Sequence, residues 1–159
     1  MKNESENLVL RETKPEDEQF LFEVYASTRQ DELAGLGWDD NQKRDFIKMQ
    51  FLARERSYPR VDDRIIILNG VPIGRMLIDR NDEEILLKDI ALLTQYRNRG
   101  LGTILIHELM DEASVSGKAI LLHVLATSAA VRLYERLGFS RTGFEAAYLE
   151  MKWFPSASN

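Results

Sequence analysis

Residues 84–125 of the sequence carry a strand pattern, a loop with two glycines, an amphipathic helix pattern and a second strand pattern, in that order. Residues 84–93 and 119–125 are mostly apolar, and the apolar residues that follow Gly102 fall on one helical face up to Gly117. Two strands joined through a helix lie parallel in one sheet. This β-α-β crossover constrains the fold more than any other feature of the chain.

The residues before the crossover predict a strand and two helices. Residues 8–11 form an apolar strand pattern, and a helix begins near Pro15. The first helix is indicated by apolar residues at helical spacing: Phe20, Leu21, Val24 and Tyr25. A second helix, ending before Pro59, is indicated by another such set: Phe46, Met49, Leu52 and Ala53.

Asn69-Gly70 separates the apolar runs 64–68 and 71–78, which is a strong signal for a two-residue β-hairpin. With residues 84–93 these runs predict an antiparallel meander. A further helix is expected over residues 130–137, and closing strands over 141–153. The order of elements predicts an α+β protein with a mixed sheet flanked by helices and one central crossover.

Length and composition limit the class of protein. A chain of 159 residues suits a single domain, expected over residues 8–154 with a short flexible tail at 155–159. The net charge of −5 argues against a protein that coats nucleic acid, and the absence of cysteine excludes an acyl-cysteine intermediate. Without a long apolar run or a signal-peptide pattern, we expect a cytoplasmic protein that does not insert in a membrane.

The loop over residues 95–103 predicts an anion site. Gly100 and Gly102 allow a ligand to approach the backbone, and the first-turn amides of the following helix favour negative charge. Arg97 and Arg99 add positive charge. The loop matches neither the dinucleotide-binding fingerprint nor the P-loop. The alternative interpretation is a tight structural turn with solvated arginines.

Two motifs resemble the GNAT superfamily of N-acetyltransferases. Arg97-x-x-Gly100-x-Gly102 matches the family's Gln/Arg-x-x-Gly-x-Gly/Ala signature, between the expected fourth strand and third helix. Residues 130–139 look like the family's segment after its fifth strand. The resemblance implies a mixed, mostly antiparallel sheet whose crossover carries the acyl-coenzyme A site. It also implies acetyl transfer from acetyl-coenzyme A to an amine, without a metal.

The resemblance further implies which residues contact acetyl-coenzyme A. The backbone of residues 97–103 would surround the pyrophosphate, and the strand around residues 90–92 would pair with the pantetheine arm. A backbone N–H near Leu92 would act as an oxyanion donor. The implied contacts are Ala91, Leu92, Arg97, Asn98, Arg99, Gly100, Leu101, Gly102, Thr103, Thr127, Ala130 and Tyr134. Thr127 stands where many relatives have an asparagine.

Two residues are candidates for proton transfer. Tyr134 occupies the position from which relatives direct a tyrosine at the coenzyme A sulfur, and a phenol with a pKa of ~10 remains a proton donor at working pH. Alternatively, Tyr134 packs in the core beside Leu133 and Leu137. Asp89 is the candidate base by its position on the cofactor strand, although a charged residue on a solvent face is the commoner case.

The remaining features leave the acceptor open. The helix segment at His107–Asp111 lacks the second histidine of a zinc-protease helix, so no metal site is expected, and His123 is expected to be a partly buried structural residue. Arg29, Glu32, Trp38 and Asp39 lie where relatives build the acceptor pocket. Two alternatives to an enzyme remain, an acyl-coenzyme A sensor of the same fold and an interaction protein with a structural glycine loop. Homodimers are common in the family.

Overall fold

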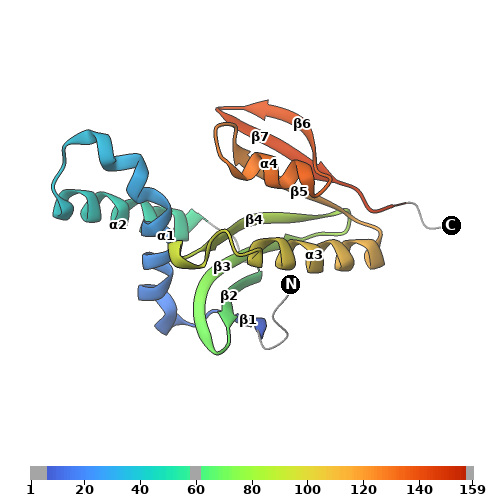
Figure 1. Cartoon of the computed structure of the whole chain (residues 1–159), viewed down its shortest axis with the longest axis horizontal. Coiled ribbons are helices and arrows are strands. Elements are labelled where there is room, and N and C mark those ends of the chain that lie inside the picture. The colour runs from blue at the N-terminus through green and yellow to red at the C-terminus, as the bar shows by residue number, and fades with distance from the viewer. Residues whose placement is uncertain (1–6, 58–61, 157–159) are drawn as a thin grey trace. The chain divides into compact units, whose positions relative to one another are not determined.

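The structure, a computed structural model, describes residues 7–57 and 62–156, apart from the side chains of residues 30–32 and 57. Within them the chain forms α-helices, short 3-10 helices (η) and strands in the predicted order (Figure 1). In sequence order these elements are β1 (Leu8–Glu12), η1 (Pro15–Asp17), α1 (Glu18–Leu33), η2 (Ala34–Leu36), α2 (Asp40–Ser57), β2 (Asp62–Leu68), β3 (Val71–Arg80), β4 (Glu84–Leu92), η3 (Thr94–Tyr96), α3 (Leu101–Ser116), β5 (Ala119–Leu125), α4 (Ala130–Arg136), β6 (Ser140–Glu145) and β7 (Tyr148–Trp153).

The described strands hydrogen-bond in the order β1-β2-β3-β4-β5-β7-β6. β1 and β2 are antiparallel, β4 and β5 are parallel, and β7 is antiparallel to both β5 and β6. The parallel pair is the one joined through α3, so the predicted crossover and the mixed α+β class are confirmed. Asn69 and Gly70 have φ of 51° and 82°, as a two-residue type I′ turn between β2 and β3 requires.

The chain divides into two compact units. The first comprises Met1–Leu77 with Asp89–Leu101, and the second comprises Ile78–Lys88 with Gly102–Asn159. The expectation of one domain over residues 8–154 stays a prediction. Of the expected tail, Pro155 and Ser156 lie in neither a helix nor a strand, and residues 157–159 lie outside the described residues. Among the described residues, no helix is long and apolar enough to cross a bilayer.

In the first unit, α1 and α2 bury aromatic rings against each other and against β2. Phe51 of α2 lies 5.7 Å from the ring centroids of both Phe22 and Tyr25 of α1, and Ile65 of β2 belongs to the same cluster. Asp39 begins α2 through a capping box, because its carboxylate accepts the Gln42 amide N–H at 2.8 Å.

The predicted second helix is confirmed as α2, but the apolar residues that indicated it are not all buried. Met49 is 64% exposed and Ala53 is also exposed, whereas Ile47 and Phe51 are buried. Apolar residues occur on two sides of this helix, and only the side that meets α1 and β2 is covered. Leu52, at the edge between the two sides, is partly buried against the cluster.

In the second unit, the expected apolar face of α3 is buried throughout: Leu105, Ile106, Leu109, Met110 and Ala113. α3 ends at Gly117, whose φ of 70° gives the left-handed conformation common after a helix. β5 buries Ile120, Leu121 and Leu122 in succession, as a strand covered on both faces does.

Candidate active site

The glycine-containing loop leads from η3 into α3. Asn98 and Gly100 have φ of 60° and 78°, so the backbone turns through two left-handed residues before the helix begins at Leu101. A Cβ added to Gly100 or Gly102 would meet no atom within 4 Å. The backbone is therefore open to a ligand at the position where the unpaired amides of the first turn of α3 favour an anion.

The two arginines of this loop make different contacts. Arg97 donates from Nε to the Leu92 carbonyl oxygen at 2.9 Å and from Nη2 to the Ser27 hydroxyl at 3.3 Å. Its guanidinium thus joins the loop to the end of β4 and to α1. Arg99 is exposed, and its guanidinium lies 5.7 Å from the centre of the Tyr96 ring.

β4 contains one residue more than the stretch of β3 with which it pairs. The Asn81 amide donates to the Glu84 carbonyl oxygen at one end of the β3–β4 pair, and the Leu93 amide donates to the Ile73 carbonyl oxygen at the other. Between these two bonds β4 has one residue more than β3, which is the definition of a bulge.

Gly74 of β3 accommodates the distorted end of β4. A Cβ at Gly74 would lie 2.2 Å from the Ala91 carbonyl oxygen and 2.9 Å from a Leu92 methyl carbon. These distances are shorter than any real contact, so only glycine fits at this position unless β4 moves. The close approach lies at the two residues expected to pair with the pantetheine arm.

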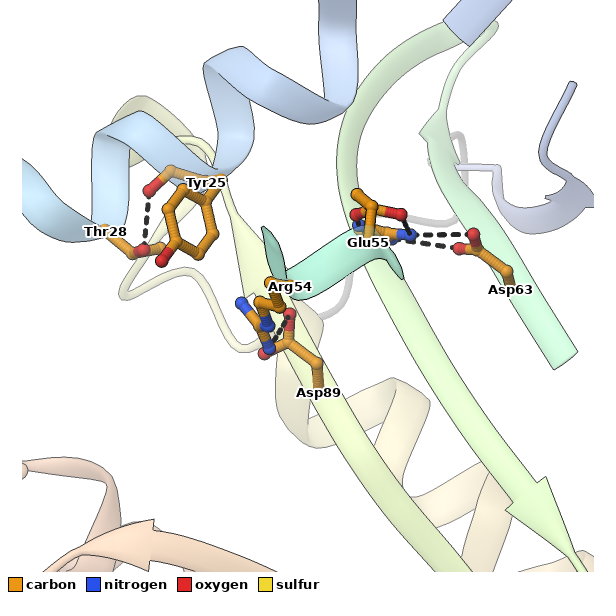
Figure 2. Close-up of polar contacts among 7 residues, drawn as sticks. Tyr25, Thr28, Arg54, Glu55, Asp63 and Asp89 are labelled. Atoms are coloured by element: carbon orange, nitrogen blue, oxygen red, sulfur yellow. Dashed lines mark hydrogen bonds and ion pairs between the residues drawn. The ribbon is translucent and has the colours of Figure 1, made fainter. Parts of the chain in front are cut away.

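Asp89 points from β4 toward α2. Its carboxylate pairs with the Arg54 guanidinium at 3.3 Å, and each of the two side chains is 25% exposed. The same guanidinium lies 5.3 Å from the centre of the Tyr25 ring of α1, so that Arg54 stands between Tyr25 and Asp89 (Figure 2). Asp89 therefore faces the helices of the first unit.

Burial raises the pKa of the Asp89 carboxyl above its usual range. The charges of Arg54, Arg75 and Arg29 and the Ile90 backbone N–H act in the opposite direction, because each stabilises the carboxylate. The carboxyl is still 25% exposed, so water limits the effect of burial. A carboxyl with a raised pKa is a stronger proton acceptor when ionised, which suits a general base.

A second ion-pair group joins Glu55, the residue after Arg54 on α2, to side chains of β2 and β3 (Figure 2). Arg75 of β3 is 5% exposed and pairs with Glu55 of α2 and with Asp63 of β2, the latter at 2.8 Å. α2 is thus held to both strands by ion pairs. Toward β4 it presents the positive charge of Arg54, and toward β3 the negative charge of Glu55. Burial lowers the pKa of Arg75, but its hydrogen bonds to both carboxylates outweigh burial and raise the pKa overall.

Tyr134, on α4 in the second unit, is 8% exposed, and its ring meets Phe139 edge-on with centroids 5.6 Å apart. Ala130 is partly buried at the start of α4, and Thr127 is exposed in the turn that precedes it. The Ser128 hydroxyl, which our sequence analysis missed, accepts the Ala130 amide at 3.1 Å and helps to begin the helix.

The predicted site residues of the first unit lie on two adjoining segments. Asp89, Ala91 and Leu92 belong to the end of β4, and the Arg97 side chain connects the glycine loop to that end. Thr103, in the first turn of α3, belongs to the second unit and is partly buried. Of the expected acceptor segment, Trp38 packs edge-on against Phe46 with centroids 5.3 Å apart, while the Glu32 side chain lies outside the described residues.

Sequence reasoning missed Arg54 and Gly74, whereas Tyr25 begins the segment of residues 25–40 in which the acceptor pocket is expected. A signal existed for Gly74, because a glycine inside a strand pattern often marks a bulge or a close backbone approach. Arg54 follows the buried Phe51 by three residues and so lies on the inward face of α2, but the sequence alone does not tell which apolar side of this helix is covered.

The expectation for His123 was wrong. Its side chain is 56% exposed and lies 3.7 Å from Glu150 of β7. Within residues 7–57 and 62–156, no three histidine or acidic side chains come together as metal ligands would.

Known proteins resemble the chain in sequence and in structure. Over 98 residues it is 32% identical to the uncharacterized N-acetyltransferase CgeE of Bacillus subtilis (strain 168), a match that covers 55% of this chain and 38% of that protein. The chain thus spans well under half the length of this curated relative.

Two solved structures share the fold. The PaiA N-acetyltransferase of Thermoplasma acidophilum, in complex with coenzyme A, has a TM-score of 0.70 and 17% identity over 93% of this chain and 99% of that one. The ribosomal-protein-S18-alanine N-acetyltransferase of Escherichia coli has a TM-score of 0.63 and 20% identity over 96% and 97%. The model of the acetyltransferase (GNAT) family matches residues 14–139. The chain therefore belongs to the acetyltransferase (GNAT) family.

Proposed function

We propose that this protein transfers an acetyl group from acetyl-coenzyme A directly to a primary amine of a small molecule or peptide. The observation that carries the proposal is the open glycine loop at the start of α3, in a chain that belongs to an acetyltransferase family. The structural neighbour from Thermoplasma acidophilum, solved with coenzyme A, supports the same class of donor.

The residues at the loop fit a pyrophosphate. Gly100 and Gly102 leave the backbone uncovered, and no acidic residue occurs from Tyr96 to Thr103. We propose that the amides of the first turn of α3 hold the phosphates, because a helix N-terminus attracts anions. Arg99 would add positive charge, whereas Arg97 would contribute through its backbone while its side chain positions the loop on Leu92.

The end of β4 would orient the reacting group. Acetyl-coenzyme A supplies an activated thioester when it is bound. In our proposal, Ala91 and Leu92 pair with its pantetheine arm, and a backbone N–H at Leu92 donates to the thioester oxygen as negative charge develops there. The bulge supports this role, because a bulge redirects backbone groups away from the neighbouring strand. Thr127, in the turn before α4, and Ala130, the first residue of α4, would also contact the donor.

Two side chains would transfer protons. An amine is mostly protonated at neutral pH, so Asp89 would take one proton from it before its nitrogen forms the new bond to carbon. Tyr134 would supply the proton that the departing sulfur needs as the carbon–sulfur bond breaks. The assignment of Tyr134 rests on its sequence motif and on the helix that holds it.

The Tyr134→Phe variant tests the enzymatic proposal against a sensor of the same fold. It removes the hydroxyl and keeps the packing of the ring on Phe139. We expect turnover to fall by ~10²-fold or more while the affinity for coenzyme A, measured by calorimetry, is nearly unchanged. Tyr148→Phe, at an exposed tyrosine of the same unit, is the control and should retain full turnover.

Two results would count against the proposal. Normal turnover in Tyr134→Phe, with the chemical step shown to be rate-limiting, would assign Tyr134 to packing alone. A wild-type protein that binds coenzyme A yet releases no thiol with any amine would be a sensor.

A further inference from the structure

The surroundings of Asp89 are unusual for a carboxylate that receives a cationic amine. The positive charges of three arginines act on its carboxylate: Arg54 from α2, Arg29 from α1 and Arg75 from β3. Arg75 is neutralised by Glu55 and Asp63. Arg54 contacts the Asp89 carboxylate directly, at 3.3 Å.

Tyr25 holds two of these guanidinium groups on the α1–α2 side of Asp89. Arg29 lies 4.9 Å and Arg54 lies 5.3 Å from the centre of its ring. Tyr25 is itself only 7% exposed, so its ring is a fixed surface. Contact with an aromatic face restrains the orientation of a guanidinium group.

This arrangement disfavours an acceptor that carries only positive charge. An ammonium group that approaches Asp89 comes near the Arg54 guanidinium as well, and like charges at such distances repel in a partly buried site. An acceptor with a carboxylate beside its amine meets no such penalty, because it presents a negative charge to Arg54 and a positive charge to Asp89.

The two charges of an α-amino acid have the right spacing for this ion pair. Its nitrogen and carboxyl carbon are about 2.5 Å apart, as standard bond lengths and angles fix them. The facing Arg54 and Asp89 groups are 3.3 Å apart. A guanidinium group has five N–H donors in a planar fork, so it can bind a second carboxylate while it remains near the first.

We propose that the acceptor is a zwitterion of the α-amino acid class, with its ammonium at Asp89 and its carboxylate at Arg54. The inference rests on the proposed acetyl transfer and names its substrate class. Arg54 is then the residue that determines specificity, and Tyr25 is a positioning residue that acts through Arg54.

The same arrangement explains how the product leaves. Asp89 removes one proton from the ammonium group, the nitrogen bonds to the acetyl carbon, the carbon–sulfur bond breaks, and the sulfur gains its proton from Tyr134. The second ammonium proton leaves the nitrogen as the amide forms and restores the Tyr134 hydroxyl by way of solvent, and Asp89 then gives its proton to water, so that one proton is released in each turnover. The product keeps its carboxylate but has no positive charge, so its attraction to Asp89 is lost and only the contact with Arg54 remains.

The test compares three matched acceptors with wild-type protein and acetyl-coenzyme A: a free α-amino acid, its carboxamide and the amine that lacks the carboxyl group. The comparison is made for each of the natural amino acids, and the reaction is followed by the release of free coenzyme A thiol. We expect at least one amino acid to exceed its carboxamide in kcat/KM by about 10-fold to 100-fold, the range that a charge-assisted hydrogen bond supports. A preference for carboxamides, polyamines or peptide N-termini would overturn the proposal.

Arg54→Gln and Arg44→Gln separate specificity from stability. Both arginines lie on α2, and each combines an ion pair with an aromatic contact: Arg44 pairs with Glu23 at 2.7 Å and lies 4.8 Å from the Phe22 ring. Arg54→Gln should raise KM for the amino acid and remove its advantage over the carboxamide, whereas Arg44→Gln should retain it. An equal loss for both acceptors in Arg54→Gln would assign Arg54 a structural role and overturn the proposal.

Calorimetric titration of the amino acid into the protein with bound coenzyme A distinguishes the two possible failures. Binding that depends on Arg54, with no thiol release, would contradict the acetyl transfer but support the ligand class. Thiol release with simple amines and amino acids alike would support the acetyl transfer and overturn the ligand class.

Discussion

At the scale of single residues, Gly74 shows how one missing side chain permits the geometry of the site. The Ala91 carbonyl occupies the space of its Cβ, at 2.2 Å. A glycine in the strand pattern of residues 71–78 was visible in the sequence as a candidate for a close approach. The group that approaches Gly74, the Ala91 carbonyl, was not predictable, because the register between β3 and β4 includes an extra residue that strand patterns do not reveal.

We predict that Gly74→Ala lowers the free energy of unfolding by roughly 1–3 kcal/mol, since the methyl group must displace backbone atoms of β4. Activity should fall further than stability explains, because Ala91 and Leu92 belong to the proposed donor site. Urea unfolding and thiol release measure the two effects. Gly35→Ala is the control, because a Cβ there meets nothing within 4 Å, and it should change stability by less than about 0.5 kcal/mol. Wild-type stability and activity in Gly74→Ala would contradict the close approach.

At the scale of elements, the sequence predicted the helices, strands and turns whose local sequence pattern matches the side that the folded protein buries. The Asn69-Gly70 hairpin, α3 and β5 were found where expected, because turn chemistry, helical period and an unbroken apolar run each have one interpretation. The sequence does not tell which side of α2 is buried, because Met49 and Ala53 extend the apolar surface beyond the side that packs. The pairing of Arg54 with Asp89 was not predictable, since it joins residues 35 positions apart through tertiary structure.

The junction of β1 with α1 gives a prediction for pH. Asp17 accepts two hydrogen bonds from Arg11 and one from the Lys14 amide, all at 2.8 Å, and the bonds to Arg11 above all hold its pKa at about 2. The ordinary value in an unfolded chain is about 3.9. A carboxyl whose pKa is lowered on folding stabilises the protein above the unfolded value and loses this effect as the pH falls through the folded value.

We therefore expect Asp17→Asn to lower the free energy of unfolding by about 1–3 kcal/mol at pH 7, the range for hydrogen bonds to a charged group. The difference from wild type should diminish as the pH falls from about 4 to about 2. Arg11→Met, which removes the partner, should show the same pH dependence. Urea unfolding over this pH series is the measurement, and a difference that does not change with pH would contradict the ion pair.

At the scale of the whole molecule, an acidic chain carries local groups of cations. The net charge is −5, yet the glycine loop lacks acidic residues and the carboxylate of Asp89 is surrounded by arginines from α1, α2 and β3. The overall negative charge therefore does not prevent the binding of an anion at a local site. The loop suits the phosphates of the proposed donor, and the Arg54–Asp89 pair suits an acceptor that carries both charges.

Acetyl transfer is tested most directly when thiol release and acetylated product are measured in one reaction, with acetyl-coenzyme A and the amino acid set. Our account predicts equal amounts of free coenzyme A and of an acceptor heavier by one acetyl group, at a rate well above that without acceptor. In Gly100→Val the affinity for coenzyme A should fall, because a branched side chain covers the backbone and also strains its left-handed conformation, with φ of 78°. The account would be contradicted if wild-type protein, saturated with acetyl-coenzyme A, released no more thiol in the presence of amines than in their absence.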